Sequence, residues 1–96
     1  MRLWYAPRAR RDIADIHEYI AKHNPRAATA VLRGIRATAR LLARHPGLGR
    51  DTDHADIRVL AVARYPYLVY HTVTGNELVI VHIRHGARAA PKPGEL

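Results

Sequence analysis

Arginines and histidines recur near the carboxyl end of this chain, inside segments that are otherwise apolar. Residues 67–73 and 78–83 have the β-branched and aromatic composition of two strands, joined by a turn at Gly75-Asn76. The basic residues within and just beyond these strands are His71, His82, Arg84, His85 and Arg88. Arginine binds phosphate or carboxylate, and histidine exchanges protons near neutral pH. The block therefore predicts either a binding surface or an acid–base site.

The register of the strands determines which of these side chains share a face of the sheet. A two-residue turn at 75–76 would pair His71 with Ile80, Val69 with His82, and Tyr67 with Arg84. A second tight turn at 64–65 places Arg58 opposite His71 on the same face. We therefore expect an outer, solvent-facing side that carries Arg58, Tyr67, His71, His82 and Arg84. The core-facing side is expected to carry Leu68, Tyr70, Val79, Val81 and Ile83.

Two interpretations of this outer side remain open. Its cations and tyrosine could bind RNA through phosphate contacts and stacking, with histidines to move protons. Basic residues on the solvent side of a sheet can equally serve only solubility or edge protection. No metal site is expected, because His82 and His85 point to opposite faces of one strand and the only nearby carboxylate is Glu77, at the turn. No catalytic triad order or glycine-rich phosphate loop is recognised, and no cofactor is expected.

A short strand and a helix open the chain. Arg2–Tyr5 is a partly apolar run, and Pro7 suits the first position of a helix. Isoleucines then recur at helical spacing, and opposite charges lie four residues apart on the other face. We expect this amphipathic helix to end near His23.

A second helix and a further strand connect this first helix to the basic block. Asn24-Pro25 supplies a good helix cap and a good first helical residue, so a helical hairpin is predicted. The proline and glycines of the segment 45–49 end the second helix near Arg44. Residues 51–56 are expected to form a polar loop, and 57–63 a strand. Together the elements predict an α+β fold of the form β-α-α-β-β-β, with the helices packed on one face of a three-stranded antiparallel meander.

The second helix carries arginines without acidic partners. There is no Asp or Glu between Pro25 and Arg50. Spacings of three, four and four residues place four arginines on one face, here named the arginine stripe: Arg33, Arg36, Arg40 and Arg44. Like charges at this spacing repel by roughly a few tenths of a kcal/mol per pair. The stripe therefore predicts an acidic partner, unless it is only a solvated face.

Length and composition limit what these elements can build. The 96 residues suffice for one domain, which we place at 1–88, followed by a flexible tail at 89–96 that is rich in proline. Sixteen Lys and Arg against eight Asp and Glu give a net charge of +8, which favours an acidic protein or nucleic acid as partner, although GC-rich coding alone can produce an arginine bias. With no cysteine and no apolar run of signal-peptide or membrane-spanning length, we expect a cytoplasmic protein without membrane association.

The order of these motifs resembles the RelE/ParE superfamily of type II toxins. The resemblance covers residues 2–88 and rests on four features in order. They are Asn-Pro between two helices, His-Pro-Gly-Leu-Gly-Arg at 45–50, Tyr-Pro-Tyr-Leu-Val-Tyr at 65–70, and the ending Val-Ile-Val-His-Ile-Arg-His-Gly-Ala-Arg at 79–88. Each member is encoded beside an antitoxin that wraps its flexible C-terminal part around the toxin. The resemblance thus implies a hetero-oligomer and supplies an acidic partner for the arginine stripe.

The superfamily has two main activities that require different residues. ParE-like members bind and inhibit DNA gyrase, and the helical hairpin, the glycine turn and the His-Gly-Ala-Arg ending look closer to them. This implies no catalytic residue. The positions expected to contact target or antitoxin are the arginine stripe with Arg58, Tyr67, His82, Arg84, His85 and Arg88. The alternative is a RelE-like endoribonuclease that cuts messenger RNA on the ribosome through Arg58, His71, Arg84 and His85. A third interpretation is an antitoxin-binding module without toxicity.

Overall fold

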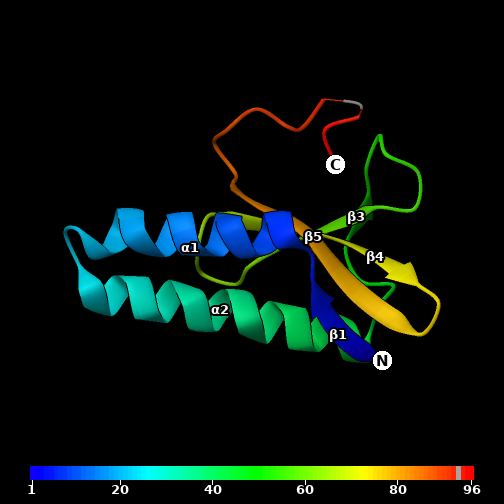
Figure 1. The fold of residues 1–96 in the computed structure, drawn as a ribbon, viewed down its shortest axis with the longest axis horizontal. Helices are drawn as coiled ribbons and strands as arrows, with labels where there is room; N and C mark the ends of the chain where they lie inside the picture. Colours follow the sequence, from blue (N-terminus) through cyan, green and yellow to red (C-terminus); the bar gives the residue numbers. More distant parts are fainter. Residues whose placement is uncertain (93) are drawn as a thin grey trace.

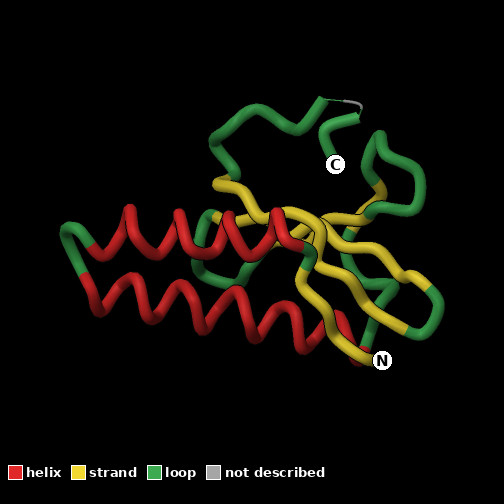
Figure 2. Tube along the Cα trace, in the orientation of Figure 1, coloured by secondary structure: helices red, strands yellow, loops and turns green. Residues whose placement is uncertain are grey.

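The computed structural model describes residues 1–92 and 94–96 and consists of two layers, a helical hairpin on one face of a five-stranded sheet (Figures 1 and 2). The elements in chain order are β1 Arg2–Tyr5, α1 Pro7–Ala21, α2 Pro25–Arg44, β2 Arg50–Asp51, β3 Arg58–Ala61, β4 Tyr67–Thr74 and β5 Glu77–His85. Neither helix of the described chain is long and apolar enough to span a membrane. The predicted α+β fold is confirmed.

Both helices begin at the prolines that the sequence indicated. Each proline takes an early position in its helix, where a backbone donor is not needed. The side chain of Asn24 caps α2 by accepting the backbone N–H of Ala27 at 3.0 Å. The first helix ends at Ala21, two residues before the predicted end, and α2 ends at Arg44 as predicted.

The sheet contains more than the predicted meander. Its strand order is β1-β5-β4-β3-β2, and β1 runs parallel to β5. The helical hairpin connects β1 to β2, the strands at the two opposite edges of the sheet. β3, β4 and β5 form the expected antiparallel meander. Asp51, the first residue of the predicted polar loop, instead joins Arg50 in the two-residue strand β2, which pairs with β3. The tail residue Pro93 lies outside the described residues.

A β-bulge changes the predicted register of β4 against β5. The pairs from Thr74–Glu77 to His71–Ile80 follow the two-residue turn as predicted. The register then shifts between Tyr70 and His71, so one extra residue, Val81, is accommodated in β5. The observed pairs beyond the shift are Tyr70 with His82, Val69 with Ile83, Leu68 with Arg84 and Tyr67 with His85. The predicted pairs of Val69 with His82 and Tyr67 with Arg84 are therefore wrong.

The predicted assignment of the two sheet faces is also wrong for the central strands. Tyr67, His71 and His82, which were predicted on the solvent side, are 7%, 1% and 8% exposed. Val69 and Ile80, the predicted partners of His82 and His71, are each 0% exposed. The core beneath the helices is formed by Ala9, Val31, Ile35, Ala39, Leu42, Val62, Tyr67, Val69, Leu78, Ile80 and Ile83. Both faces of these strands are apolar enough to be a core, so alternation alone does not decide which one the helices cover.

Candidate functional site

Arg58 holds the loop that follows α2. Its two Nη atoms donate to the Gly49 carbonyl at 2.7 Å and to the Asp51 carboxylate at 2.8 Å, and its Nε lies 3.5 Å from the Leu48 carbonyl. The side chain is half-buried by this loop. Because all three guanidinium nitrogens contact residues of the protein itself, the main role of Arg58 is to hold residues 48–51 against β3.

His71 lies under the same loop and opposite Arg58 in the β3–β4 ladder. Its ring nitrogens lie 3.2 Å from the Leu48 carbonyl and 3.3 Å from the Val69 carbonyl. A neutral imidazole carries one N–H and so donates to only one of them. Burial lowers the pKa of His71, the two carbonyls oppose this, and the Arg58 charge adds to the lowering. The residue is 1% exposed, and its ring nitrogens lie against backbone carbonyls, so its role is structural.

Stability is expected to decrease when the pH falls below 6.5, the ordinary pKa of histidine, because of His71. Below this pH the unfolded chain binds a proton at His71 more readily than the folded chain, in which the pKa is lowered. The contribution of His71 to the free energy of unfolding is therefore complete above 6.5 and decreases as the pH falls toward the pKa of the folded chain. Urea unfolding at about pH 7.5 and about pH 5.5 measures this loss. The variant His71→Gln should lose less stability between the two pH values. An equal loss in both proteins would contradict this role.

Arg84 braces the turn that ends β5. Its Nε donates to the Tyr70 hydroxyl at 2.8 Å, and its Nη1 donates to the carbonyl of His85 at 3.2 Å and to that of Arg88. The guanidinium carbon also lies 5.7 Å from the centre of the Tyr70 ring. Arg84 therefore positions the His-Gly-Ala-Arg ending, and only part of its donor capacity faces outward.

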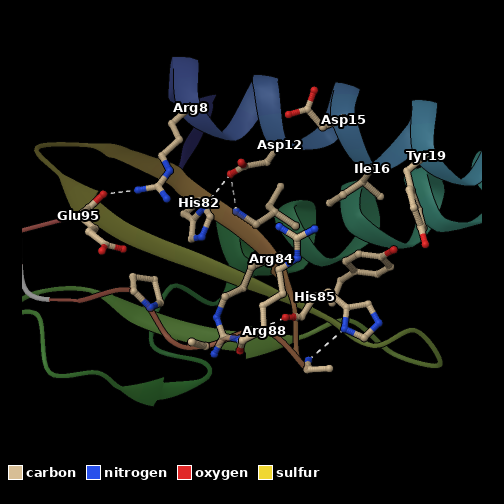
Figure 3. Close-up of a pocket in the computed structure, with 15 residues that line it drawn as sticks. Arg8, Asp12, Asp15, Ile16, Tyr19, His82, Arg84, His85, Arg88 and Glu95 are labelled. Carbon is tan, nitrogen blue, oxygen red and sulfur yellow. Dashed lines mark hydrogen bonds and ion pairs between the residues drawn. The ribbon is translucent and has the colours of Figure 1, made fainter.

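Asp12 is a residue whose role the sequence did not indicate. One oxygen of its carboxylate lies 2.7 Å from Nδ1 of His82 and accepts the backbone N–H of Ile83 at 3.0 Å (Figure 3). β1 pairs with β5 only as far as Ile80, so the edge of β5 beyond that residue has no strand beside it. The carboxylate accepts a backbone N–H of this open edge that no strand pairs with, and it links α1 to β5.

A cavity of about 550 Å³ lies between α1, the end of β5 and the tail (Figure 3). Its wall combines aromatic and charged residues, which include Arg8, Asp12, Tyr19, Tyr67, His82, Arg84, His85, Arg88 and Glu95. The His85 ring stands edge-on to the Tyr67 ring at 5.4 Å, and its Nδ1 accepts the Ala87 N–H at 3.0 Å. Arg88 and Tyr19 are exposed at the rim. The cavity brings together the predicted residues near the carboxyl end.

The arginine stripe is exposed along its whole length. The ion pairs of the described chain are Arg58 with Asp51 and His82 with Asp12, so within these residues the stripe has no acidic partner. Beside it, a groove of about 590 Å³ runs between the two helices. The groove is lined by Tyr5, Arg10, Ile13, Ala14, His17, Glu18, Leu32 and Arg36. The apolar floor, with Arg10 and Arg36 beside it and Glu18 as the one carboxylate among these lining residues, fits an amphipathic segment whose acidic side chains lie toward the two arginines.

Comparison with known proteins decides what kind of molecule carries these features. The family model of the ParE toxin of the type II toxin-antitoxin system parDE matches residues 3–90. This chain belongs to that family. Toxin RelE3 of Caulobacter vibrioides is 33% identical over 81 residues, which cover 82% of this chain and 87% of RelE3. The protein Y4kP of Sinorhizobium fredii is 29% identical over 91 residues, covering 95% and 94% of the two chains.

A solved structure of the chromosomal ParDE system from P. aeruginosa shares the fold of this ParE-family chain. The TM-score is 0.80 at 24% identity, over 88% of this chain and 95% of that one. The predicted membership of the RelE/ParE superfamily is thus confirmed.

In this ParE-family toxin, the four residues of the ribonuclease alternative do not form one cluster. Arg58 on β3 pairs with His71 in the middle of β4, and both bond to the loop after α2. Arg84 and His85 pair with Leu68 and Tyr67, which lie three and four residues from His71 along β4. In an extended strand this separates the two pairs of residues by about 10–13 Å. In the described part of the chain, no three histidine, cysteine or acidic side chains gather to bind a metal ion.

Proposed function

We propose that this ParE-family toxin is a binding inhibitor of DNA gyrase, without catalytic turnover, that a cognate antitoxin neutralises. The observation that carries the proposal is the state of the candidate nuclease residues. Arg58, His71 and Arg84 bond to the protein's own backbone, and His71 is buried. A general base must reach the proton that it abstracts, and His71 cannot do so from under the loop. Family membership supports the toxin role, and the choice of gyrase is the inference.

The surface proposed for the target is the rim of the cavity at the end of β5. Tyr19 and Arg88 are exposed there, and His85 is half-buried beside them. Exposed tyrosine and arginine are the side chains that most often dominate binding energy at protein interfaces. This surface is distinct from the arginine stripe, so target and antitoxin need not contact the same residues.

A ribosome-dependent endoribonuclease is the second candidate function. It is favoured by the similarity to a relative named RelE3 and by the pairing of His85 with Tyr67 beside Arg88. These three residues offer a proton carrier, a stacking ring and a phosphate contact.

One experiment separates the two functions. The chain is expressed without an antitoxin, and cellular messages and supercoiling by purified gyrase are both examined. We expect growth arrest with inhibited supercoiling and intact messages. Cleavage of messages within codons, with gyrase unaffected, would overturn the proposal in favour of the ribonuclease. Unimpeded growth would indicate an antitoxin-binding module without toxicity.

The antitoxin is proposed to lie across the helical hairpin and the neighbouring sheet, with acidic side chains on the arginine stripe. Replacing all four stripe arginines by glutamine is expected to weaken antitoxin binding about 10- to 100-fold, because each exposed ion pair contributes roughly 0.2–1 kcal/mol. The loss should shrink at high salt, which screens exposed charges. Calorimetric titration at two salt concentrations measures both effects.

A matched control removes four exposed cations elsewhere. Glutamine at Lys22, Arg50, Arg64 and Lys92 lowers the net charge by the same amount but leaves the stripe intact. This variant should bind the antitoxin within about threefold of the unmodified chain, as expected for exposed charges outside an interface. Equal weakening in both variants would mean that net charge, and not the stripe, attracts the antitoxin.

A further inference from the structure

The strand β1 forms one edge of the sheet, and half of its backbone groups lack partners. It pairs only with β5, and the N–H groups of Arg2 and Ala6 donate to carbonyls on that side. Successive residues of a strand direct their backbone groups to opposite sides, so those of Leu3 and Tyr5 face away from β5. In the described residues they have no backbone partner. An unprotected edge of this kind is a template for another strand.

The two faces flanking this edge differ in chemistry. The side chains of Leu3 and Tyr5 pack toward the helices, beside the core. On that side, Tyr5 and Arg36 line the same groove between the helices. Burial raises the pKa of Tyr5, and the charges of Arg36 and Arg40 oppose the rise. On the opposite side, Trp4 is 45% exposed. The edge therefore has cations along one face and an apolar aromatic ring on the other.

We propose that β1 accepts an extended segment of an acidic partner as an additional strand of the sheet. Its acidic side chains lie toward Arg36 and Arg40, and the alternate apolar side chains cover Trp4. This inference deepens the proposed function, on which it rests for the identity of the partner, because it specifies how the antitoxin is bound. Main-chain hydrogen bonds supply affinity in such strand addition, and side chains of alternate residues supply specificity.

Arg36 and Arg40 lie one helical turn apart on α2. β1 runs at a steep angle to α2 (Figure 1), so a strand added beside β1 approaches these cations across the helix. Acidic side chains on the helix-facing side of the added strand therefore lie toward the two guanidinium groups. A segment that alternates acidic and apolar residues satisfies both faces of the edge at once.

Hydrogen exchange of individual backbone amides tests this inference on the full chain. In the free toxin, the Leu3 and Tyr5 amides should exchange rapidly, whereas the Trp4 amide, which faces β5, should be protected. When the antitoxin encoded beside the toxin is bound, exchange at Leu3 and Tyr5 should slow by about tenfold or more. Bound antitoxin with no slowing at these two amides would overturn the inference, while leaving the gyrase inhibition of the proposed function intact.

A backbone variant removes one hydrogen bond without changing a side chain. Leucic acid in place of Leu3, introduced by chemical synthesis, converts the outward amide to an ester and should weaken antitoxin binding about 2- to 10-fold. The matched control places the corresponding ester at Ala55, which is exposed in the loop between β2 and β3, and it should leave affinity unchanged. Equal effects of the two esters would count against strand addition.

A synthetic peptide tests the edge of β1 if the antitoxin does not bind the toxin. That failure would contradict neutralisation by the antitoxin, which is part of the proposed function, but strand addition at β1 could still be measured directly. An eight-residue peptide of alternating valine and glutamate should shift the amide signals of Leu3 and Tyr5, and the same peptide with lysine for glutamate should not. No shift with either peptide, or equal shifts with both, would overturn the inference.

Discussion

Replacing Gly49 with alanine is expected to destabilise the toxin by about 2–4 kcal/mol. Gly49 has a φ angle of +93°, a region that L-residues with a side chain enter only at a cost of roughly 1–2 kcal/mol. An added Cβ would also lie 2.4 Å from the carbonyl oxygen of Val59 in β3. Backbone cannot move aside as a flexible side chain can, so the loop or the strand must shift.

The matched control for this substitution lies two residues away in the same loop. A Cβ at Gly47 would meet nothing within 4 Å, and Gly47 has no positive φ angle. Gly47→Ala should therefore change stability by less than about 0.5 kcal/mol, as exposed substitutions usually do. Chemical denaturation measures both variants, and the slope with denaturant should stay unchanged in each. Equal stability of the two variants would contradict the argument.

The loop that carries the sequence motif at 45–50 makes close contacts with the sheet around Gly49. The Gly49 carbonyl accepts from Arg58, the Leu48 carbonyl lies beside His71, and Gly49 itself lies against Val59. Those contacts hold the end of α2 against the sheet. Arg58 and His71 were expected on an open working surface because their residue types permit such chemistry. The hydrogen bonds that occupy them come from a loop that is distant in sequence and whose path no pattern specifies.

Elements with local signals were predictable, and those that depend on tertiary contacts were not. Prolines and the Asn24 cap fixed the starts of both helices, because capping involves only neighbouring residues. The bulge at Val81 left no such signal, since no glycine or proline marks its position in the strand. It altered every pair from Tyr70 back to Tyr67, at the start of β4. The partner of Asp12 was equally hidden, because charges four residues apart within α1 offered a simpler local explanation.

Replacing Asp12 with alanine is expected to destabilise the toxin by about 2–4 kcal/mol and to loosen the end of β5. The change removes a charge-assisted contact of 2.7 Å with His82 and the acceptor of the Ile83 N–H. His82 is 8% exposed and Ile83 is 2% exposed, so water cannot easily replace the lost oxygen. The β5 amides beyond Ile80 should then exchange faster, whereas those paired with β1 should stay protected.

Two further variants separate the charge of Asp12 from its hydrogen bonds. Asp12→Asn keeps an oxygen that can accept the Ile83 N–H but lacks the negative charge, so it should cost less, about 1–2 kcal/mol. Asp15→Ala removes an exposed carboxylate from the wall of the same cavity and should cost less than about 0.5 kcal/mol. Denaturation and amide exchange are measured for all three. If Asp15→Ala destabilises as much as Asp12→Ala, the effect reflects general charge on α1. If only Asp12→Ala loosens β5, the carboxylate of Asp12 takes the place of the strand that β5 lacks beyond Ile80, and it thereby holds the surface that carries His85 and Arg88.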